Sequence, residues 1–235
     1  MKKFLGLLLS VLISISILEV AYAQSSKPLI QVSVKIIVTD PLKYDLGKTI
    51  PEVDVDKLNL TPEQKDKLAK LREKLQESEI KYQRQFANTW NKALKPAVQK
   101  SDQNAIKKAK EELLNTLKEL QKARINYYFE MQKVLTQEQL KHFPILFTKE
   151  QVDRFEQIRE DYDKERLNLD IARMIEAYKV QELRKNNAST KEINTRIALI
   201  VAIDNKKKDD LVNYRVALRE VLTKEQREIL FAEKK

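Results

Sequence analysis

The chain has 235 residues, of which 45 are lysine or arginine and 35 are aspartate or glutamate, giving a formal net charge of +10. It contains no cysteine and one histidine, His142, so disulfides, thiol catalysis and cysteine-ligated zinc sites are excluded. Only two glycines accompany 34% charged residues, a composition that favours long uninterrupted helices.

Residues 1–23 have the pattern of a secretory signal peptide. Lys2 and Lys3 precede an apolar run from Phe4 to Leu18, and Ala21-Tyr22-Ala23 forms a small-residue cleavage site. The apolar run is shorter than the roughly 20 residues that a membrane-spanning helix needs. We therefore predict cleavage after Ala23, export to the periplasm and a soluble mature protein.

Residues 24–58 differ in composition from the rest of the chain. The stretch from Leu29 to Val38 is rich in β-branched residues and partly alternating, which predicts a strand. Pro41, Gly47 and Pro51 indicate loops after it. A single strand has no partner in a helical chain, so we expect an extended or β-like N-terminal arm. It is either unstructured or packed on the body of the protein or on a second copy.

Residues 59–145 and 146–235 are each predicted to form a hairpin of two long helices closed by a short capped helix. In both halves apolar residues recur at a spacing of three or four. In the first half these are Leu68, Leu71, Leu75, Tyr82, Phe86, Trp90 and Leu94, then Leu113, Leu117, Leu120, Tyr127, Met131 and Val134. Polar turns fall at 101–104 and 186–189, and Pro96 is expected to stop or kink its helix. The predicted fold is all-α, with two tandem hairpins.

A five-residue motif occurs four times and relates the two halves. The copies are Leu60-Thr61-Pro62-Glu63-Gln64, Leu135-Thr136-Gln137-Glu138-Gln139, Phe147-Thr148-Lys149-Glu150-Gln151 and Leu222-Thr223-Lys224-Glu225-Gln226. The members of each pair are 75 residues apart, and a shift of 87 residues maps the first pair onto the second. This regularity indicates a tandem duplication.

Each Thr-x-x-Gln is predicted to form a capping box, in which the threonine hydroxyl and the glutamine side chain satisfy free backbone N–H groups at a helix start. The preceding apolar residue can pack against the fourth helical residue at Leu135 and Phe147. At Leu60 and Leu222 that position is a lysine or an arginine, so this contact is not expected there.

Paired Leu-Thr-x-x-Gln motifs, about one helical hairpin apart and preceded by an export signal, resemble the Spy/CpxP family of periplasmic proteins. The resemblance covers about residues 59–233, taken as two copies. It implies an ATP-independent chaperone, or a stress-response regulator, without a cofactor. In Spy-like relatives two hairpin subunits form a cradle with a basic, partly apolar concave face. The tandem copies imply that one chain could supply both halves of such a cradle.

Metal binding through His- and Met-rich segments, known in some members of that family, is not carried over to this chain. After cleavage only His142, Met131 and Met174 remain, and they are well separated in sequence. A soft or borderline metal would lack ligands, so we expect no metal site.

The two halves differ most at an apolar run in the second one. Residues 197–203 are apolar at all seven positions, whereas the matching residues 110–116 are amphipathic. Three lysines follow the run at 206–208, so an unfolded client or an oligomer partner could bind there, or the N-terminal arm could pack on it. The candidate binding residues are Ile197, Leu199, Ile200, Val201, Ile203, Lys206, Lys207 and Lys208.

No catalytic arrangement is visible, and we expect that the chain is not an enzyme. Export argues against nucleic acid as the partner of the positive charge. The favoured hypothesis is a holdase for unfolded or partly folded envelope proteins. The alternatives are a regulatory binding module for a membrane sensor kinase and a structural helical protein that self-assembles into a homo-oligomer.

Overall fold

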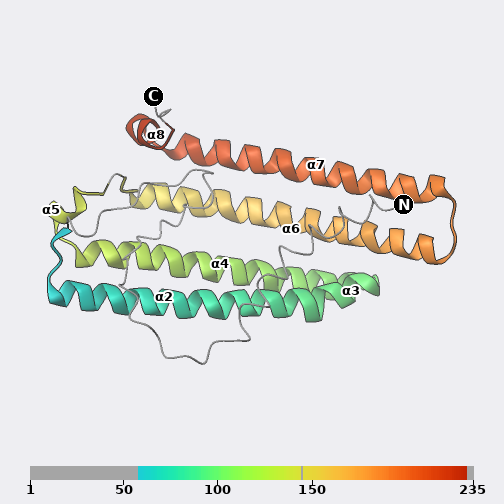
Figure 1. Ribbon diagram of the computed structural model, residues 1–235, viewed down its shortest axis with the longest axis horizontal. Helices are drawn as coiled ribbons and strands as arrows, with labels where there is room; N and C mark the ends of the chain where they lie inside the picture. The colour runs from blue at the N-terminus through green and yellow to red at the C-terminus, as the bar shows by residue number, and fades with distance from the viewer. Residues whose placement is uncertain (1–57, 144, 232–235) are drawn as a thin grey trace, which may run out of the picture. The chain divides into compact units, whose positions relative to one another are not determined.

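The computed structural model describes residues 58–143 and 145–231 (Figure 1). The predicted signal peptide and all of the predicted arm except Leu58 lie outside these residues. Within them the chain is all-α, as predicted, and contains no strand. Helices α2 (Pro62–Thr89) and α4 (Gln103–Val134) form the first hairpin, followed by the short α5 (Gln137–Leu140). Helices α6 (Lys149–Lys185) and α7 (Thr190–Val221) form the second, followed by α8 (Lys224–Phe231).

All four predicted capping boxes are present. In the first, the Gln64 backbone N–H donates to Thr61 Oγ1 at 3.2 Å, and the Thr61 N–H donates to Gln64 Oε1 at 3.1 Å. The same two hydrogen bonds occur at the motifs that begin α5, α6 and α8. The residue before each threonine is buried, including Leu60 and Leu222. These two leucines are fixed by a tertiary core rather than by the fourth residue of their own helices.

The first helix passes through Pro96 instead of stopping there. Helix α2 continues into a π-helical turn, η2 (Trp90–Leu94), and then into α3 (Lys95–Gln99). Proline lacks an N–H, and its ring crowds the carbonyl four residues earlier. The wider π turn, in which the Lys95 N–H donates to the Trp90 carbonyl, accommodates the proline.

Both hairpin turns fall where the polar residues predicted them, and neither contains glycine. Ser101 and Asn187 take the left-handed conformation, with φ of 55° and 52°, that glycine usually provides at a helix end. The Asp102 and Ser189 side chains then cap α4 and α7. Each turn therefore has a left-handed residue after its first helix and a side-chain cap before its second. The side-chain cap fixes where the second helix begins.

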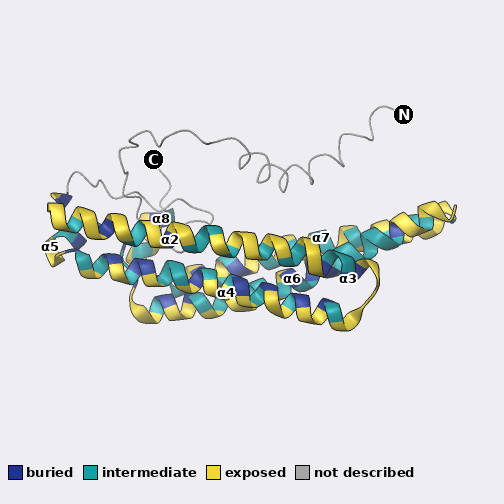
Figure 2. Ribbon diagram, turned by 90° about the horizontal axis from the view of Figure 1, so that it is seen from below, coloured by how far each residue is buried: buried dark blue, intermediate teal, exposed yellow. Residues whose placement is uncertain are grey.

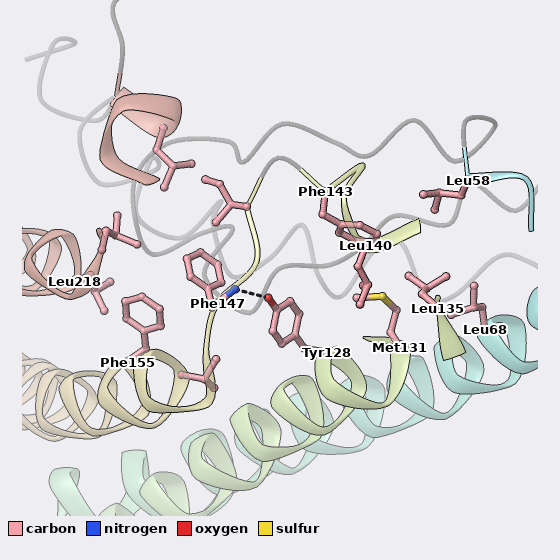
Figure 3. Close-up of a cluster of buried hydrophobic side chains, with 14 of the residues drawn as sticks. Leu58, Leu68, Tyr128, Met131, Leu135, Leu140, Phe143, Phe147, Phe155 and Leu218 are labelled. Carbon is pink, nitrogen blue, oxygen red and sulfur yellow. Dashed lines mark hydrogen bonds between the residues drawn. The ribbon is translucent and has the colours of Figure 1, made fainter. Parts of the chain in front are cut away.

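One hydrophobic cluster contains residues from both halves of the chain (Figure 3). Tyr128 and Met131 of α4 lie in the same cluster as Phe147, Phe155 of α6 and Leu218 of α7. The backbone N–H of Phe147 also donates to the Tyr128 hydroxyl at 2.8 Å, a buried bond between the first hairpin and the segment that starts the second. The two hairpins therefore share a core at this end.

A second cluster joins α6 to the other end of the first hairpin. Leu167 and Ile171 of α6 pack with Leu94, Val98 and Leu113, and also with Ala97, Ile106 and Ala109. No residue of α7 belongs to this cluster. Helix α6 thus contacts the first hairpin on one side and α7 on another.

Replacing Tyr128 by phenylalanine is expected to lower the free energy of unfolding by about 1–2 kcal/mol. The ring packing is retained, but the buried Phe147 N–H loses its acceptor. Urea unfolding followed by circular dichroism measures the change. Tyr127→Phe is the matched control, because the buried Tyr127 hydroxyl has no hydrogen-bond partner among the described residues. An equal loss in both variants would contradict the role given to the Tyr128 bond.

Candidate binding surface on helix α7

Helix α7 buries only two of its 32 residues. Its buried residues are Tyr214 and Leu218, both near its C-terminal end. None of the residues 190–213 is buried (Figure 2). Because α6 also packs on the first hairpin, α7 lies at an edge with α6 as its main neighbour. Most of the surface of α7 is therefore not covered by the other residues that the structure describes.

Ion pairs connect α7 to α6 along the part of α7 that contains no buried residue. Arg173 Nε lies 2.8 Å from Asp204 Oδ1, and Arg196 Nη1 lies 3.1 Å from Glu176 Oε2. The positions that Arg173 and Asp204 occupy are held in the first repeat by Phe86 and Leu117. The second hairpin thus has an ion pair at the positions where the first has two apolar residues.

The predicted apolar run lies on this open part of α7. Ile197, Leu199 and Val201 are 37%, 43% and 53% exposed. Ile200 and Ile203 are half-buried. Residues two apart on a helix point in nearly opposite directions, so Leu199 faces away from Ile197 and Val201. The run therefore presents apolar side chains on more than one side of the helix.

The predicted lysine cluster is largely neutralised by α6. Lys206 pairs with Glu165, and Lys207 pairs with Asp170. The Lys206 hydrogen bond lowers the pKa of the Glu165 carboxyl, with Asn168 as a further donor. Lys208 is exposed and has no ion pair with the residues that the structure places. Of the three predicted lysines, only Lys208 remains as an uncompensated charge beside the apolar residues.

Two further exposed apolar residues of α7 were not predicted. Val212 and Val216 are 58% and 46% exposed. They continue the line of Ile197 and Val201 along the helix. Leu211 precedes Val212, and Ala217 and Leu218 follow Val216, but these apolar stretches are only two and three residues long, so a search for long apolar runs does not find them. The spacing of four residues between Val212 and Val216 is the sequence signal that could have identified them.

The motif glutamines do more than cap their helices. Gln64 Nε2 donates to Gln139 Oε1 at 2.8 Å, and Gln139 Nε2 donates back to Gln64 Oε1 at 3.0 Å. The same reciprocal pair joins Gln151 and Gln226, at 2.7 Å and 3.2 Å. Each Nε2 also donates to a backbone carbonyl, for example that of Val221. Each pair therefore fastens a long helix start to the short helix that closes its hairpin.

These features define a class of protein: an all-α tandem hairpin, held by paired glutamines, with an exposed apolar edge helix. No known protein family, curated protein or solved structure matches the chain. None of the described helices is both long and apolar enough to cross a membrane. The described residues also contain no group of three or more His, Asp or Glu side chains placed to hold a metal ion.

Proposed function

We propose that the chain is an ATP-independent periplasmic holdase that captures unfolded or partly folded envelope proteins on α7. The observation that carries the proposal is the exposure of Ile197, Leu199 and Val201 on an edge helix. Ile197 and Val201 lie on one side of the helix, and exposed apolar groups that lie together usually indicate an interaction site. The Spy/CpxP-like motif pairs and the predicted export signal support the same function.

Capture in this proposal is weak and does not depend on client sequence. The positive net charge of the chain attracts acidic segments and speeds encounter, and this effect weakens as salt rises. Apolar client side chains then lose contact with water against α7. The lysines paired with α6 contribute little to the attraction, so the apolar contacts hold the client. A client that folds buries its own apolar residues and leaves.

The test is aggregation of a denatured protein, followed by light scattering, with the mature chain present and without ATP. The wild type is expected to suppress aggregation. The triple variant Ile197→Ser, Leu199→Ser and Val201→Ser is expected to lose most of this suppression, because its changes remove the exposed apolar groups of the 197–203 run. Circular dichroism of the variant should remain that of the wild type, since none of these residues is buried.

Ile229→Ser is the matched control, because Ile229 is an exposed apolar residue on α8, outside the run. It is expected to suppress aggregation as the wild type does. Equal suppression by the triple variant would reject α7 as the capture site. No suppression by the wild type at several-fold excess would reject the holdase function.

A further inference from the structure

Six exposed residues form a line along α7, which we call the outer stripe. The outer stripe consists of Ile197, Val201, Asn205, Lys208, Val212 and Val216. At 100° per residue these positions fall within an arc of about 100°, the width of one helix face. The buried residues Tyr214 and Leu218 lie on a different arc, toward α6. Helix α7 therefore has a second face, apolar at both ends and polar in the middle.

The spacing of the outer stripe reads the same from either end. Successive members are four, four, three, four and four residues apart. When two such helices lie antiparallel about the midpoint, Ile197 faces Val216 of the second copy and Val201 faces its Val212. Asn205 then faces Lys208 of the second copy. A twofold interface requires this kind of self-complementary patch.

We propose that two copies of the chain pair through the outer stripes of α7, with the two helices antiparallel. Eight apolar side chains that are now exposed would lose contact with water. A parallel arrangement would instead place Lys208 against Lys208. The central Asn205–Lys208 contacts supply less stability than apolar ones would, but they fix the register.

A second copy explains the stripe better than the N-terminal arm does. An arm packed along α7 would gain nothing from a spacing that is symmetric about its centre. The hairpins of one chain already share a core, so this contact joins two complete chains rather than completing one. The inference does not rest on the proposed function. Because Ile197 and Val201 serve both surfaces, a second copy and a client would compete.

Introduced cysteines test the register, because the chain has no cysteine of its own. Val201→Cys and Val212→Cys are oxidised separately and as an equal mixture, at concentrations where the wild type is dimeric by sedimentation. In the antiparallel register the two 201 positions are about 16 Å apart along the helices, too far for a disulfide. Cross-linked dimer is therefore expected in the mixture and not in either variant alone. Cross-linking of one variant to itself would overturn the proposal.

Charge variants at one exposed position test the central contact. Asn205→Asp places a carboxylate opposite Lys208 of the second copy and is expected to lower the dimer dissociation constant about fivefold. Asn205→Lys gathers four positive charges there and should raise it at least about tenfold. Sedimentation of both variants over a concentration series measures the two shifts. No difference between them would contradict the register.

A wild type that remains monomeric at all concentrations would overturn the proposal. Slow labelling of the Val201→Cys thiol in such a monomer would identify the N-terminal arm as the covering segment. None of these measurements uses a client. A chain that dimerises without suppressing aggregation would therefore support the dimer and reject the proposed function. A chain that suppresses aggregation but remains monomeric would support the proposed function and reject the dimer.

Discussion

Replacing Phe155 by alanine is expected to lower the free energy of unfolding by about 3–5 kcal/mol. Phe155 is 2% exposed, and its ring stands perpendicular to that of Phe147 with the centroids 5.3 Å apart. Removing it leaves a cavity where α6 meets the segment between the repeats. Because Tyr128 and Met131 of the first hairpin line the same cluster, both hairpins should lose stability.

Two optical signals can separate the hairpins in this experiment. Circular dichroism reports on all the helices, whereas the single tryptophan, Trp90, lies in the first hairpin. A shared core predicts that Phe155→Ala lowers the urea midpoint of both signals together, although the substitution is in the second hairpin. A Trp90 transition that stays at the wild-type midpoint would contradict the shared core.

The first hairpin supplies a matched variant. Leu68 occupies the position of Phe155 in the first repeat and is buried in the same cluster. Leu68→Ala is expected to cost about 2–5 kcal/mol and to shift both signals as well. Ile229→Ala, at an exposed position on α8 outside the outer stripe, should change stability by less than about 0.5 kcal/mol.

Local signals made most of the fold predictable. Helix starts depend on residues only three apart, so the capping boxes could be located from Thr61 and its three counterparts. Turns likewise followed from short polar segments at 101–104 and 186–189. What could not be predicted depends on contacts between distant residues. The burial of Leu60 and Leu222 is one example, since the fourth residue of each following helix is charged and cannot cover them.

The candidate surface was predictable only in part, for the same reason. Residues 197–203 are apolar on every side of a helix, so some exposure followed from the sequence alone. The neutralisation of Lys206 and Lys207 could not be predicted from the sequence, because their acidic partners are 41 and 37 residues away. The outer stripe was missed because Val212 and Val216 matter only once the exposed side of α7 is known.

Replacing Gln151 by glutamate is expected to lower the free energy of unfolding by about 2–3 kcal/mol. Gln151 Oε1 accepts from the Thr148 N–H, and its Nε2 donates to Gln226 Oε1 and to the Val221 carbonyl. A carboxylate can still accept but cannot donate. Two part-buried acceptors would therefore lose their donor, and two oxygens would face each other. Rotating the Gln226 amide would not help, because its NH₂ would then face the Thr223 N–H.

A fifth capping box in the same chain provides the control. Ser189 and Glu192 form it at the start of α7, where hydrogen bonds from Ser189 keep the pKa of the Glu192 carboxyl low. Glu192 is exposed and has no glutamine opposite it, so Glu192→Gln should change stability by less than about 0.5 kcal/mol. Urea unfolding measures both variants. Similar small effects would mean that the glutamines act only as caps. A large loss confined to Gln151→Glu would explain why all four motifs end in glutamine although glutamate also caps a helix.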